Sequence, residues 1–129
     1  MKSISLKKEV FASMDSTIEK VTKSLQEEGF GVLTRIDMHL KMKEKLNKDM
    51  AATIILGACN PSLAFRAVEK NTDVTSLMPC NVVLRDVGNG KVSVEFAQAK
   101  PILALLEDKN LATIAEEADA CLQRAMGKL

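Results

Sequence analysis

Hydrophobic and polar positions alternate along residues 3 to 10, and this alternation predicts a β-strand. Lys8 interrupts the apolar side of the strand, which favours an exposed or edge position. Apolar residues at helical spacing follow over about 14 to 28, and Gly29 comes directly after them. We therefore expect an amphipathic helix that Gly29 ends with a left-handed cap.

Four further strands are predicted by their apolar residues and by the turns between them. Alternation predicts one strand over 30 to 38, and a nearly continuous apolar run predicts a central strand over 52 to 58, covered on both faces. Gly88-Asn89-Gly90 predicts a tight hairpin between strands at 81 to 87 and 91 to 97.

Four more helical segments are expected, and two of them are short. Residues 40 to 50, rich in Lys and Met, indicate a helical turn or short helix, and a short apolar helix is expected over about 101 to 107. A helix over about 61 to 70 has Asn60 as its N-cap. The last helix, about 111 to 126, is strongly amphipathic.

The long elements follow the order β-α-β-β-β-β-α in a single domain spanning 1–129. This order predicts an α+β fold in two layers, an antiparallel sheet with two long helices on one face. The other face of the sheet would then need a cover, and a second copy of the chain is the expected one.

Composition excludes several classes of partner. The formal net charge is +1 and aromatic residues make up 3% of the chain, so neither charge nor stacking favours nucleic acid. No stretch approaches the roughly 20 apolar residues of a membrane helix, and the first residues do not resemble a secretory leader. Three cysteines without a leader indicate a cytoplasmic protein with reduced thiols.

Two short motifs each place a thiol beside an amide at the end of a predicted strand: Cys59-Asn60-Pro61 and Cys80-Asn81. One interpretation is that both thiols are inert packing residues. A second is a pocket in which the thiols and amides contact a small molecule. A third is a metal or redox pair, in which the helix beginning at Pro61 would favour the thiolate of Cys59.

The same motifs show a resemblance to a known family. Ile36-Asp37, Met42-Lys43-Glu44-Lys45-Leu46, the run Ile55-Leu56-Gly57-Ala58-Cys59-Asn60-Pro61 and the run Pro79-Cys80-Asn81-Val82-Val83 resemble the bacterial and archaeal "domain of unknown function 302" family. The resemblance implies a fold of the TATA-binding-protein-like class, in the order β-α-β(4)-α, and a homodimer. It implies no DNA binding, and the family has no established activity.

Three residues outside the motifs complete the candidate set. Asp37 and Lys45 are outer candidates for a ligand-binding site, and His39 is a candidate base or third metal ligand beside Cys59 and Cys80. Our first hypothesis is a homodimeric small-molecule-binding or sensing module whose ligand and cofactor are unknown. The alternatives are a thiol-dependent or metal-dependent enzyme using the same cysteines, and a purely structural interaction module.

Overall fold

One antiparallel sheet forms the centre of the structure, a computed structural model that describes residues 3–129. Residues 1–2, where the N-terminal segment considered above begins, lie outside the described residues. The strands are β1 (Ser5–Phe11), β2 (Gly31–Asp37), β3 (Thr53–Cys59), β4 (Cys80–Gly88) and β5 (Lys91–Ala97). They lie in the order β1-β5-β4-β3-β2, so the predicted edge position of the first strand is confirmed.

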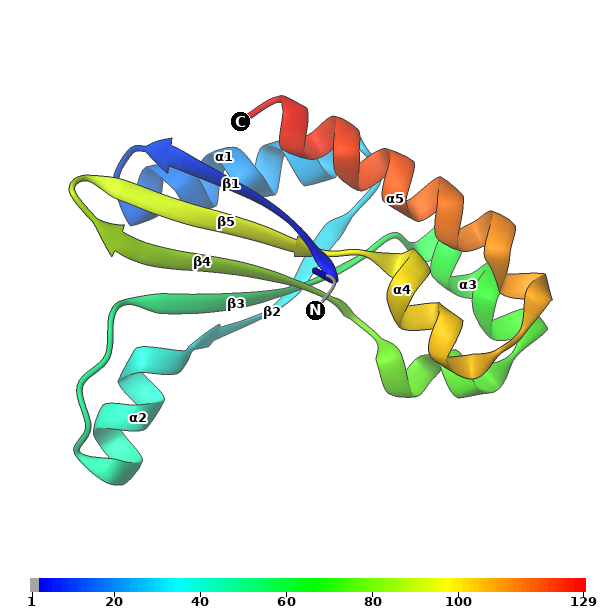
Figure 1. Cartoon of the computed structure of the whole chain (residues 1–129), viewed down its shortest axis with the longest axis horizontal. Coiled ribbons are helices and arrows are strands. Elements are labelled where there is room, and N and C mark those ends of the chain that lie inside the picture. Colours follow the sequence, from blue (N-terminus) through cyan, green and yellow to red (C-terminus); the bar gives the residue numbers. More distant parts are fainter. Residues whose placement is uncertain (1–2) are drawn as a thin grey trace.

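Two long helices lie on one face of the sheet, and shorter helices lie at both of its ends (Figure 1). They are α1 (Met14–Glu27), α2 (Met38–Leu46), α3 (Pro61–Lys70), α4 (Ala99–Leu103) and α5 (Ala112–Gly127), with 3₁₀ segments η1 (Thr72–Leu77), η2 (Ala104–Leu106) and η3 (Lys109–Leu111). The long helices α1 and α5 cover the same face of the sheet, which is the predicted α+β arrangement. In the described part of the chain, no helix is long and apolar enough to cross a membrane.

The main core lies between the sheet and the two long helices. Alternate residues of the inner strands point into it, and α1 and α5 add the apolar stripes that the sequence predicts. Its fully buried members include Val21, Leu25, Leu56, Val82, Leu84, Val94, Phe96 and Leu122. Strand β3 is buried apart from Ile55 and Cys59, which agrees with the strand predicted from its continuous apolar run.

Strand β2 differs from its prediction, because a β-bulge changes which residues share a face. Val32 lies opposite Ala58 and Thr34 lies opposite Gly57, so Leu33 is an extra residue between them. Val32 packs against the core under the helices, whereas Oγ1 of Thr34 lies against Gly57 on the other face. Strict alternation along this strand was therefore a wrong expectation.

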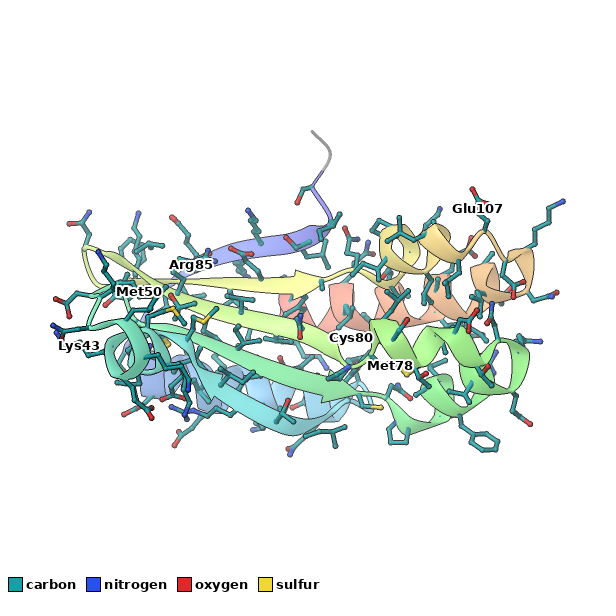
Figure 2. All side chains as sticks on the ribbon, turned by 90° about the horizontal axis from the view of Figure 1, so that it is seen from below. Lys43, Met50, Met78, Cys80, Arg85 and Glu107 are labelled. Atoms are coloured by element: carbon teal, nitrogen blue, oxygen red, sulfur yellow. The ribbon has the colours of Figure 1, made fainter. Side chains whose placement is uncertain are left out.

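The second face of the sheet has no long helix over it. Helix α2 projects from one end of the sheet on the side away from α1 and α5 (Figure 1). None of its residues is buried, and Leu40 and Leu46 are more than half exposed. Figure 2 shows this face from below, with Met50 and Arg85 at the end of the sheet nearest α2.

Candidate functional site

The two Cys-Asn motifs meet where β3 ends and β4 begins. Strands β3 and β4 are antiparallel neighbours, with Ala58 opposite Cys80 and Gly57 opposite Asn81. Cys59, the next residue of β3, is thus brought beside the start of β4. Together the cysteines and both asparagines line one cavity with a volume of about 120 Å³.

The cavity lies at the end of the sheet farthest from α2, between the end of β3, the α3–η1 segment, α4 and α5. Its wall is mostly apolar, and Figure 2 shows two of the lining residues, Met78 and Cys80, where β4 begins. Its aliphatic residues are Ala58, Leu63, Ala64, Ala67, Leu77, Met78, Pro79, Ala97, Ala99, Ile102, Leu103, Ile114 and Ala118. No charged side chain lines this cavity in the described part of the chain, so a buried ionic ligand would lack a counter-charge.

Both thiols are neutral at ordinary pH because burial opposes the charged form. The pKa of Cys80 is raised to about 11, mainly by burial and also by the neighbouring Cys59 and Asp119. Burial also raises the pKa of Cys59. This raised pKa opposes the Cys59 thiolate that the third interpretation required.

The amide of Asn60 has a structural task, unlike that of Asn81. The backbone N–H of Leu63 donates to Oδ1 of Asn60 at 3.2 Å, which confirms the predicted N-cap of α3. Its Nδ2 donates to the carbonyl of Glu28 at 3.3 Å and so ties α3 to the end of α1. Asn81 is exposed and its side chain, like its register partner Gly57, faces the side of the sheet away from α1 and α5, so only its backbone borders the cavity. Pro61 begins α3 outside the lining.

The outer candidates lie away from this cavity. Nδ1 of His39 accepts a hydrogen bond from the backbone N–H of Thr53 at 3.0 Å, at the start of β3. Cys59 is at the opposite end of that strand, roughly 20 Å away at about 3.3 Å per residue. Asp37 lies beside the same strand start, opposite Ile54, and forms an ion pair with Arg35 at 2.8 Å.

The metal site expected from Cys59, Cys80 and His39 is therefore not assembled. Among the described residues, no group of three or more His, Cys, Asp or Glu side chains is placed to hold a metal ion. Lys45, near the end of α2, does not line the cavity either. The sequence could not reveal that His39 and Lys45 lie far from the two cysteines, because this distance depends on which end of β3 each of these residues is near.

A buried carboxylate behind the cavity wall was missed by the sequence reasoning. Asp119 of α5 is only 8% exposed. Its oxygens accept hydrogen bonds from the backbone N–H groups of Ala99 at 2.6 Å and Lys100 at 3.0 Å. Asp119 thus caps the start of α4 and fixes the segment that supplies Ala99 to the cavity. The available signal was an acid within the apolar stripe of the last helix, four residues after Ala115.

Comparison with known proteins identifies the family. The domain described as "Domain of unknown function DUF302" matches residues 6–129. A crystal structure of an uncharacterized conserved DUF302 protein from Bacillus stearothermophilus is similar, with a TM-score of 0.90 and 28% sequence identity over 98% of both chains. No curated protein matches this chain. The expected resemblance is confirmed, and the chain belongs to the DUF302 family.

Proposed function

We propose that this protein is a small-molecule-binding or sensing module whose ligand occupies the cavity at the end of β3. The observation that supports this proposal is the joint lining of one cavity by Cys59 and Asn60 from the first motif and by Cys80 and Asn81 from the second. The cavity has the composition typical of ligand sites, a largely apolar wall with a few polar groups.

The choice of side chains keeps this space open. Six alanines line the cavity, namely Ala58, Ala64, Ala67, Ala97, Ala99 and Ala118, and they come from five different elements of the fold. The cavity is partly open to solvent, so small side chains at these positions leave a space that a ligand can enter and fill.

A thiol-dependent or metal-dependent enzyme is the less supported alternative. A reactive cysteine needs a thiolate, but both thiols have raised pKa values. A base or third ligand would have to come from His39, which is bonded to Thr53 at the far end of β3. The geometry therefore favours binding over covalent chemistry.

We also propose that the protein is a cytoplasmic homodimer with a fold of the TATA-binding-protein-like class. The fold assignment is supported by the element order and by the two long helices on one face. The dimer is supported by the uncovered sheet face and by α2, since a helix of nine residues with none buried is marginal in water on its own. The alternative of a purely structural interaction module would require only the uncovered sheet face. It would leave the cavity at the end of β3 unexplained.

The proposed function is tested by extracting bound compounds from the protein purified from its own source. The organic extract is analysed by gas chromatography–mass spectrometry for wild type, Ala64→Leu and Ala120→Leu. Ala64 lines the cavity, whereas Ala120 is a half-buried alanine of α5 outside it, which makes the second variant a matched control. We expect a compound near one equivalent in wild type and in Ala120→Leu, and its loss in Ala64→Leu. An empty extract from wild type would oppose the proposal.

A further inference from the structure

The chemistry of the cavity wall restricts the class of ligand, provided that the proposed binding function is correct. We infer that the ligand presents an uncharged, mainly aliphatic group of about six heavy atoms, with a hydroxyl or carbonyl at one end. The inference uses the charge, the volume and the free hydrogen-bonding groups of the cavity.

Charge is the first restriction. The polar side chains of the lining residues are three amides and two thiols, and none of them carries a full charge at neutral pH. The nearest carboxylate behind the wall is Asp119, and both of its oxygens already accept backbone hydrogen bonds from α4. A buried carboxylate or ammonium of a ligand would therefore lose its hydration without gaining an ionic partner.

Volume is the second restriction. The cavity measures about 120 Å³. An engineered apolar cavity of about 150 Å³ in another protein binds benzene, which has six carbon atoms. A short aliphatic chain, or the end of a longer one, fits this space. Its walls of alanine, leucine, methionine and thiol groups offer dispersion contacts to such a chain.

The free amide is the third restriction. The side chain of Asn60 already forms two hydrogen bonds, because its Oδ1 accepts from the N–H of Leu63 and its Nδ2 donates to the carbonyl of Glu28. Gln98 also lines the cavity, and among the described residues its side chain forms no hydrogen bond with the protein. The side chain of Asn81 faces the other side of the sheet, since Asn81 lies between the core residues Cys80 and Val82. An amide both donates and accepts, so the Gln98 side chain suits the hydroxyl or carbonyl end of a ligand.

The test compares three probes that share a six-carbon chain and differ only in the end group: 1-hexanol, hexanoate and hexylammonium. Each is titrated at pH 7 into the ¹⁵N-labelled full chain, and the amide shifts are followed by NMR. We expect 1-hexanol to shift the amides of Ala58, Ala67 and Cys80 in a saturable manner, with an affinity at least ten times that of either charged probe. Ala64→Leu should abolish these shifts, and Ala120→Leu should preserve them.

The outcomes separate the ligand class from the binding function. Equal or tighter binding of hexanoate or hexylammonium at the same amides would overturn the uncharged class and leave the binding function intact. Saturable shifts confined to the outer sheet face, around Met50 and Arg85, would place the site elsewhere and overturn the inference. Binding of none of the three probes would overturn the inference, and an empty organic extract would then remove the binding function as well.

Discussion

Removal of the buried carboxylate Asp119 is the sharpest test of how the cavity wall is held. In Asp119→Ala, the N–H groups of Ala99 and Lys100 lose the acceptors that now lie at 2.6 and 3.0 Å. Ala99 is only 8% exposed, so water does not easily replace its lost partner. Hydrogen bonds to charged groups contribute about 1.5–3 kcal/mol each, and we therefore expect a loss of about 3–4 kcal/mol in the free energy of unfolding.

The assay is urea unfolding followed by far-ultraviolet circular dichroism, since the chain contains neither Trp nor Tyr. Glu116→Ala, an exposed acid on the same helix, is the matched control and should change stability by less than about 0.5 kcal/mol. Asp119→Asn should fall between the two, because it keeps one acceptor and turns an N–H donor toward the other backbone N–H. A loss in Asp119→Ala no larger than the loss in Glu116→Ala would refute the reasoning.

Four further outcomes are expected from the same geometry. Gly57→Ala should lower the free energy of unfolding by about 2 kcal/mol, because the added Cβ would collide with Oγ1 of Thr34 and lie 2.8 Å from Cγ of Pro79. Thr34→Ala should recover part of that loss in a double-mutant cycle, and full additivity of the two changes would argue against the clash. Asn60→Ala should lower the free energy of unfolding by about 1 kcal/mol, because α3 loses its N-cap. Asn60→Ser, whose hydroxyl can still cap the helix, should retain most of that stability. Equal losses for the two variants in urea unfolding would contradict the capping role. Iodoacetamide should modify Cys80 about a hundred times more slowly at pH 7.5 than an exposed thiol of ordinary pKa, with the rate rising toward pH 11. The folded state holds the Cys80 proton more tightly than the unfolded state does, so stability should fall as pH rises from 9 toward 11. Cys80→Ala should reduce that slope and leave the part that comes from the raised pKa of Cys59.

Local signals in the sequence predicted most of the fold. The Gly88-Asn89-Gly90 turn joins β4 and β5 as expected, and Asn60 caps a helix that begins at Pro61 and ends at Lys70. Gly29 has φ +84°, as a left-handed cap requires. Each of these features depends only on residues that are close together in the sequence. Local pattern and propensity are therefore sufficient to predict them.

Features that depend on tertiary packing were less accessible. The bulge at Leu33 changes the face of every later residue of β2, and no glycine or proline marks it. The strand pairing that brings Cys59 beside Cys80, and the distance that separates His39 from both, could not be inferred from local patterns. The raised thiol pKa values also come from burial by α3, α4 and α5, since desolvation is their largest cause.

The central claim is that both Cys-Asn motifs line one small-molecule cavity. It is tested most directly by a crystal structure grown with 5-bromopentan-1-ol, in which anomalous scattering locates the bromine without reference to the protein structure. We expect a bromine peak among Ala67, Cys80 and Ala118, with the hydroxyl toward Gln98. A cavity filled by a side chain of a neighbouring copy, or a bromine peak only elsewhere on the protein, would contradict the account.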